Sequence, residues 1–177
     1  MPLPKSTNFK VIIVGGKSVG KTAILKLLEG VEYEPHLYES TDVENYEHTL
    51  MFEDMEIKLE IFAIPSIDKK KILNRMHIRD TNAALIVYDV DSKESMHRAQ
   101  DWAEVLQEYA RDEVCWSVAG NKMDIEGEHA VATVEGEMFS KRYKIEVFKE
   151  ISCKNNEGVD DLFQAITAQC AEADRKL

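Results

Sequence analysis

The 177-residue chain contains little cysteine and fewer basic than acidic residues. Its 3 cysteines are far apart and odd in number, which argues against a disulfide or zinc framework and suits a reducing compartment. With 22 basic residues against 33 acidic ones, the formal net charge is -11, and no dense block of Lys and Arg occurs. Nucleic acids and anionic membranes both require clustered positive charge, so we expect neither as the main partner.

Long hydrophobic runs are also absent, and none could span a bilayer. The first residues, MPLPKSTNFK, lack the apolar core of a signal peptide and the glycine needed for myristoylation, and the last, AEADRKL, lack a prenylation cysteine. We therefore expect a cytoplasmic protein with no direct lipid anchor, which reaches membranes only through partners or through a tail not present in this chain. The length suits one domain over 1–177, and the sequence does not indicate the oligomeric state.

Apolar runs alternate with segments of helical period, which is typical of an α/β sheet with crossover helices. The predicted strands are 11–14, 46–52, 57–64, 84–89, 114–120 and 147–151. The predicted helices are 21–28, 68–79, 93–110, 134–143 and 158–173. The polar segment between them at 29–45 is long for a loop in a compact domain, and such loops usually serve function.

The segment GGKSVGKT at 15–22 follows an apolar run and precedes a helical pattern. It matches the phosphate-loop pattern G-x-x-x-x-G-K-[ST], in which glycines let backbone N–H groups and a helix N-terminus face the phosphates. Lys21 is then expected to reach the β- and γ-phosphates, and the Thr22 hydroxyl to ligate Mg²⁺. The motif predicts a nucleoside triphosphate site and does not indicate the base.

The residues NKMD at 121–124 follow a predicted strand downstream of the phosphate loop. The carboxylate of Asp124 can accept both N1–H and the exocyclic amine of guanine, a pattern that adenine does not offer. Asn121 can tie this loop to the phosphate loop, and the Lys122 stem can lie over the base. This position in the chain predicts a guanine-reading loop.

The motifs GGKSVGKT, GNKMD and ISCK, in this order and spacing, resemble those of the Ras superfamily of small GTPases. The segment LIVYDVDSKESMHRAQDWAEVLQEYA at 85–110 resembles the Rab-like branch, and the resemblance covers nearly the whole chain. It implies the P-loop NTPase fold of small G proteins, with a six-stranded, mostly parallel sheet and helices on both faces. It also implies GTP or GDP with Mg²⁺ as cofactors. Cys153 replaces the family's usual alanine, and we interpret it as a buried structural thiol.

The resemblance implies a set of nucleotide-binding residues spread over the phosphate loop, both switches and the base-reading loops: Gly15, Lys17, Ser18, Val19, Gly20, Lys21, Thr22, Ala23, Tyr33, Thr41, Ser66, Asn121, Lys122, Asp124, Ser152, Cys153 and Lys154. Within this set Thr22 and Thr41 would ligate Mg²⁺, and Tyr33 would pack against guanine. Protein effectors or regulators are expected on the switch regions, about 33–46 and 63–79.

The chain departs from the family where the third strand ends: the family reads Trp-Asp-Thr-Ala-Gly-Gln-Glu, and 62–68 reads FAIPSID. Ala63 replaces the aspartate that holds a Mg²⁺ water, so we expect weaker Mg²⁺ binding than usual. Ser66 keeps the backbone N–H that the glycine offers to the γ-phosphate, while Pro65 should stiffen the loop. Ile67 cannot orient the attacking water as the glutamine does. We therefore assign no catalytic residue.

Two questions stay open at this point. Lys17 stands where the family usually has a small residue, and its ammonium either lies near the γ-phosphate, offsetting lost metal charge, or points to solvent. Asp42, Asp68 and Asp89 are the carboxylates that could replace the missing aspartate, although loop carboxylates are usually just solvated.

Three functions fit these observations to different degrees. The first is an atypical Rab-like GTP-binding protein that hydrolyses GTP very slowly and acts through partners in membrane traffic or related signalling. The second is a pseudo-GTPase, a structural or scaffold subunit without nucleotide-dependent switching. The third, a P-loop kinase, lacks an arginine-rich lid and leaves NKMD without a role, so it ranks far behind.

Overall fold

The computed structural model describes residues 6–35, 41–66 and 75–176. In chain order its elements are β1 (Ser6–Gly15), α1 (Lys21–Leu28), β2 (Glu44–Phe52), β3 (Met55–Ala63), α2 (Arg75–Arg79), β4 (Ala83–Asp89), α3 (Lys93–Tyr109), β5 (Cys115–Asn121), α4 (Thr133–Arg142), β6 (Val147–Glu150) and α5 (Val159–Asp174). This alternation confirms the predicted α/β class.

The strands form a six-stranded sheet in the order β2-β3-β1-β4-β5-β6. Only the β2–β3 pair is antiparallel, and the pairs from β3 through β1, β4 and β5 to β6 are parallel. The predicted six-stranded, mostly parallel sheet is therefore confirmed. Because β1 lies in the middle and parallel connections need crossovers, the helices must cover both faces.

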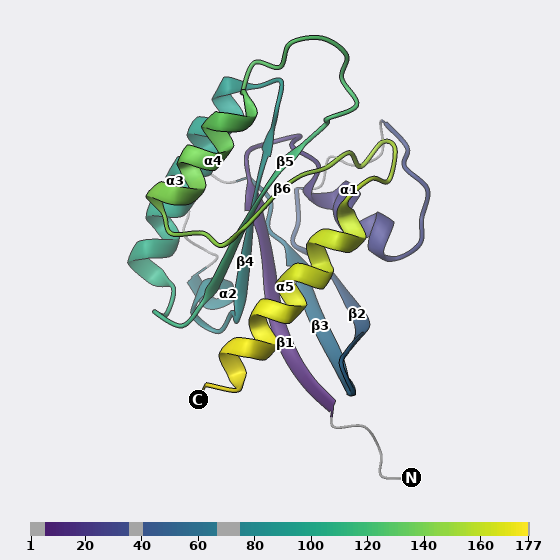
Figure 1. Ribbon diagram of the computed structural model, residues 1–177, viewed down its shortest axis with the longest axis vertical. Helices are drawn as coiled ribbons and strands as arrows, with labels where there is room; N and C mark the ends of the chain where they lie inside the picture. Colours follow the sequence, from purple (N-terminus) through teal and green to yellow (C-terminus); the bar gives the residue numbers. More distant parts are fainter. Residues whose placement is uncertain (1–5, 36–40, 67–74, 177) are drawn as a thin grey trace.

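Two hydrophobic clusters lie on the two faces of this sheet. Alternate residues of β1 enter opposite clusters: Val11 and Ile13 face α1 and α5, whereas Ile12 and Val14 face α3 and α4. Figure 1 shows α5 crossing in front of the sheet, with α3 and α4 together on the left. Among the described residues, no helix combines the length and the apolar character needed to cross a bilayer.

The described elements differ from the prediction mainly in their bounds. β1 begins at Ser6, not at 11, because its polar first half still pairs with β3, from Ser6 opposite Glu56 onward. Hydropathy detects only the stretch that is buried on both faces, and backbone pairing continues beyond it. Of the predicted helix 68–79, the structure shows α2 (Arg75–Arg79), and residues 67–74 lie outside the described part of the chain.

Tyr88 on β4 is fully buried, and its hydroxyl has no hydrogen-bond partner among the described residues. Burial raises the pKa of Tyr88, so the hydroxyl stays protonated and its donor is left unused. A buried polar group without a partner costs about 1–3 kcal/mol. Tyr88→Phe should therefore raise the free energy of unfolding by about 1 kcal/mol, measured by urea denaturation. A loss of stability in this variant would show that the hydroxyl has a partner.

Candidate nucleotide-binding site

The carboxyl ends of the parallel strands bring the sequence motifs to one edge of the sheet. Ala63 at the end of β3 pairs with Ile13, two positions before the end of β1, and Gly15 pairs with Val87 of β4. One strand further, Asp89 pairs with Asn121. In open α/β sheets this edge is where ligands bind. The topology therefore places the phosphate loop between the second-switch strand and the base-reading strands.

Gly20 and Ser18 in the phosphate loop both have positive φ angles, which most residue types adopt only with strain. Gly20 has φ 108°, and a Cβ there would collide with the Asn121 side-chain amide. Ser18 has φ 58°, a left-handed conformation that a non-glycine residue rarely adopts. Strain of this kind persists where the surrounding structure enforces it, often at ligand sites.

Lys21 lies at the start of α1 with 9% of its surface exposed. Its Nζ donates to the carbonyl oxygens of Gly16 and Gly15, at 2.5 and 3.2 Å. Burial lowers the pKa of this ammonium from 10.5 to about 8. The cation is therefore held inside the loop by charge-assisted hydrogen bonds to two carbonyl oxygens.

Helix α3 contacts the phosphate loop from the face of the sheet opposite to α1 and α5. Trp102 Nε1 donates to the Gly15 carbonyl at 3.1 Å, and the Arg98 side chain lies against Gly16. Sequence reasoning placed Trp102 on a helix but gave it no contact. The signal available was an indole, whose N–H usually finds a partner when it is covered, on a helix that must pack beside β1.

Asn121 at the end of β5 connects the base-reading loops to the phosphate loop. It is 1% exposed, and its Nδ2 donates to the Val19 carbonyl at 2.9 Å. Its Oδ1 accepts from the backbone N–H of Cys153 at 3.1 Å. One side chain therefore fixes segments that are 102 and 32 residues away along the chain.

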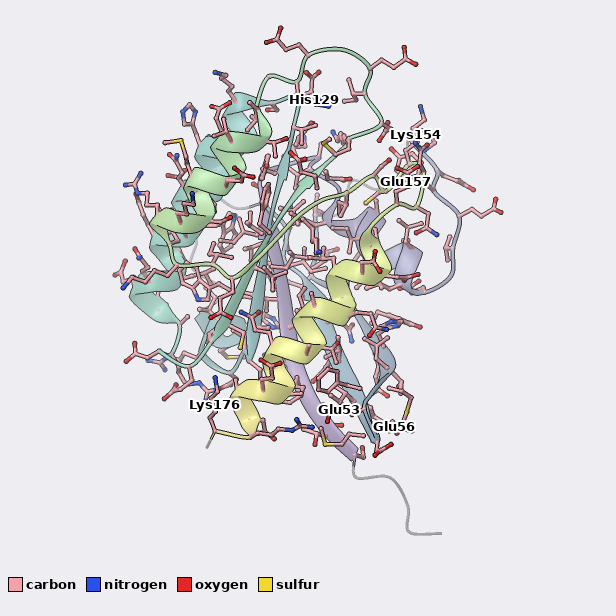
Figure 2. All side chains as sticks on the ribbon, viewed as in Figure 1. Glu53, Glu56, His129, Lys154, Glu157 and Lys176 are labelled. Atoms are coloured by element: carbon pink, nitrogen blue, oxygen red, sulfur yellow. The ribbon has the colours of Figure 1, made fainter. Side chains whose placement is uncertain are left out.

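The two base-reading loops are the segments NKMD (121–124) and ISCK (151–154). Asp124 in the first is hydrogen-bonded directly to Ser152 in the second. The Ser152 hydroxyl donates to Asp124 Oδ1 at 2.6 Å, and its oxygen accepts from the Asn155 N–H at 3.1 Å. Lys154 is exposed in the same loop, and Figure 2 shows it near Glu157 at the end of the molecule far from Glu53. The carboxylate of Asp124 is thus held by a hydrogen bond to one of its two oxygens.

Lys122 has φ 72°, and its Nζ pairs with Asp89 Oδ2 at 2.7 Å. The other oxygen of Asp89 accepts from the Asp91 N–H at 2.9 Å. The Asp89 carboxylate is therefore occupied on the base side of the site. This geometry argues against Asp89 as the substitute for the missing second-switch aspartate.

Cys153 belongs to the ISCK segment and is buried, with 2% of its surface exposed. Burial raises the pKa of its thiol to about 12, so the thiol is neutral at physiological pH. A neutral, covered thiol is a poor nucleophile and a poor metal ligand. These features support the interpretation of Cys153 as a structural residue.

The remaining candidates occupy different environments. Thr22 is buried and Ala23 lies in the core, while Lys17, Thr41 and Ser66 are exposed. The Tyr33 ring packs on the hydrophobic cluster shared by α1 and α5. Ala63, at 4% exposure, belongs to the same cluster, and Ile67 and Asp68 lie outside the described residues.

Comparison with known proteins agrees with this arrangement. Residues 10–172 match the Ras family. Over 169 residues, 95% of this chain, it is 30% identical to Ras-related protein Rab-26 of Rattus norvegicus, 31% to that of Bos taurus and 29% to that of Homo sapiens. The chain spans only 65% or 66% of the length of these relatives. The chain therefore belongs to the Ras family, and it is similar to these Rab proteins over most of its own length.

Proposed function

We propose that this chain binds GTP and GDP with Mg²⁺, hydrolyses GTP very slowly and acts by binding partner proteins. The observation that carries the proposal is an asymmetry at the sheet edge. Ser152 bonds to Asp124, and Asn121 bonds to Val19 and to Cys153, whereas β3 ends in a buried alanine without a carboxylate. We infer that the groups for base recognition are present, while β3 itself supplies no carboxylate for organising the metal ion.

Mg²⁺ would be held by the Thr22 hydroxyl, by the nucleotide phosphates and by Thr41. Mg²⁺ prefers an octahedral shell of oxygen atoms and keeps several waters, which carboxylates usually orient. With Ala63 in place of the aspartate, we propose that Mg²⁺ is held more weakly than in ordinary members of the family.

Identification of bound nucleotide tests the first part of this proposal. The purified chain should release GDP or GTP on denaturation, detected by chromatography. A stable protein that is empty and does not bind added guanine nucleotide would support the scaffold function instead.

Single-turnover hydrolysis tests the second part. The rate should lie at least tenfold below the roughly 4 × 10⁻⁴ s⁻¹ of unassisted Ras. A rate equal to that of an ordinary small GTPase would refute the roles assigned to Ala63 and Ile67.

Partner proteins are proposed to bind the switch regions, about 33–46 and 63–79. In their described parts, Val43 and Met76 expose 36% and 76% of their surface. Exposed apolar side chains of this kind contribute to protein–protein contacts. A function in membrane traffic or related signalling, in the cytoplasm and at membranes reached through partners, follows from the Rab-like character and remains part of the proposal.

A further inference from the structure

The sheet register identifies the neighbours of the position that lacks its carboxylate. Ala63 pairs with Ile13 of β1 on one side and with Glu44, the first residue of β2, on the other. This second pairing is antiparallel. Residues directly opposite in an antiparallel pair carry side chains on the same face, with Cβ atoms about 4.5–5.5 Å apart. A carboxylate on Glu44 is therefore anchored one strand away from the missing one.

The face on which Glu44 lies is settled by the alternation of burial along β2. Exposed residues alternate with partly covered ones, and Glu44 belongs to the partly covered set. Tyr46 and Leu50 in that set pack on the same hydrophobic cluster as Ala63. Since side chains of a strand repeat every second residue, Glu44 faces this side of the sheet as well.

This side of the sheet carries the phosphate loop and the beginning of α1. Val19 and Ala23 belong to the cluster that contains Ala63, and Thr22, with the proposed Mg²⁺ hydroxyl, lies between them in the chain. Helix α1 packs against both β2 and β3. The Glu44 side chain therefore shares a face with the groups that would hold the metal ion.

One oxygen of the Glu44 carboxylate is unsatisfied in this position. Its Oε2 is buried and has no hydrogen-bond partner in the described part of the chain. A buried carboxylate oxygen is costly unless something donates to it. Water molecules in the shell of a bound Mg²⁺ are strong donors, and carboxylates are the usual acceptors for them.

We propose that Glu44 takes over, across the β2–β3 pair, the metal-organising task of the carboxylate that β3 lacks. Its carboxylate accepts hydrogen bonds from Mg²⁺-bound water while Thr22 and the phosphates hold the ion. Glu44 is thus a positioning residue. The inference rests on the proposed binding of guanine nucleotide with Mg²⁺.

The test measures metal affinity and not turnover. The 177-residue chain, loaded with fluorescent GDP, is titrated with Mg²⁺ while nucleotide release is followed. Mn²⁺ binding to the GDP complex is measured by electron paramagnetic resonance. Glu44→Gln should raise the Mg²⁺ concentration needed for half-maximal retention about 10-fold or more, because glutamine keeps one neutral acceptor oxygen where the carboxylate offers two charged ones. The matched control is Glu47→Gln, an exposed glutamate on the other face of β2, which should change nothing.

A rescue variant tests whether positions 44 and 63 serve the same task. Ala63→Asp should restore retention in the Glu44→Gln background and improve it less in the parent chain, where two carboxylates would face each other across the strands. The unfolding midpoint in EDTA should be no lower in Glu44→Gln than in the parent.

Three results would overturn the inference. Glu44→Gln could match the parent in Mg²⁺ titration and Mn²⁺ binding while nucleotide stays bound, which leaves the proposed function intact. Ala63→Asp could have equal effects in both backgrounds, which would make the two positions independent. If even the parent chain retains no guanine nucleotide at saturating Mg²⁺, the proposed function fails together with the inference.

Discussion

Asp124→Asn should abolish tight guanine binding and create a preference for xanthine nucleotides. Ser152 Oγ donates to Asp124 Oδ1, so an asparagine can keep this bond with its carbonyl oxygen and turn its NH₂ toward the base. Guanine presents N1–H and an exocyclic amine there, and donors would face donors. A site built for a hydrogen-bond pattern rejects the wrong partner strongly, so we expect guanine affinity to fall about 1000-fold or more.

Xanthine carries a carbonyl where guanine carries the exocyclic amine, so it can accept from the new NH₂. Competition of unlabelled GDP, XDP and ADP against a fluorescent nucleotide measures the three affinities. Asp112→Asn, an exposed residue in the turn between α3 and β5, is the control and should keep the parent's preference. Unchanged preference for GDP in Asp124→Asn would mean that this loop does not read the base.

The sequence was sufficient for the architecture because apolar patterning, phosphate-loop glycines and base-reading motifs are local signals. The motif G-x-x-x-x-G-K-[ST] fixes a strand before it and a helix after it, and β1 and α1 flank the loop as predicted. The length of β1 was underestimated because Ser6 and its neighbours pair through their backbones, which composition does not show.

Contacts between segments far apart in the chain were harder to predict from the sequence. The bond from Trp102 to Gly15 spans 87 residues, and nothing local to either residue indicates the other. The pairing of Glu44 with Ala63 needs the register of the β2–β3 hairpin. That register follows from a two-residue turn at Glu53 and Asp54, where Glu53 has φ 51°, and these residues match none of the common hairpin-turn dipeptides.

The sequence also suggested carboxylates by type alone, which is why Asp89 was considered as a substitute. The structure shows Asp89 paired with Lys122, and it shows Glu44 on the face where the metal would be held. A carboxylate can be identified from the sequence. Whether its oxygens already have hydrogen-bond partners depends on the residues that the fold brings next to it.

Asn121→Ala should accelerate nucleotide release about 100-fold and lower the free energy of unfolding by about 2 kcal/mol or more. Truncation leaves the Val19 carbonyl and the Cys153 N–H buried without their partner, each a cost of about 1–3 kcal/mol. The larger consequence is positional, because the phosphate loop and the guanine-reading loops lose the side chain that sets their spacing. A nucleotide that binds both ends at once is sensitive to that spacing.

Two further variants separate the loss of stability from the loss of spacing. Ser140→Ala removes a buried hydroxyl that donates to the Gly136 carbonyl within α4, so it should cost about 1 kcal/mol without accelerating release. Asn121→Asp keeps an acceptor for the Cys153 N–H but places a carboxylate oxygen against the Val19 carbonyl, so it should damage the phosphate-loop side alone. Stopped-flow release of fluorescent GDP and urea unfolding supply the two readouts. If Asn121→Ala released nucleotide no faster than Ser140→Ala, the loops would be positioned by the rest of the sheet edge, and Asn121 would contribute to stability alone.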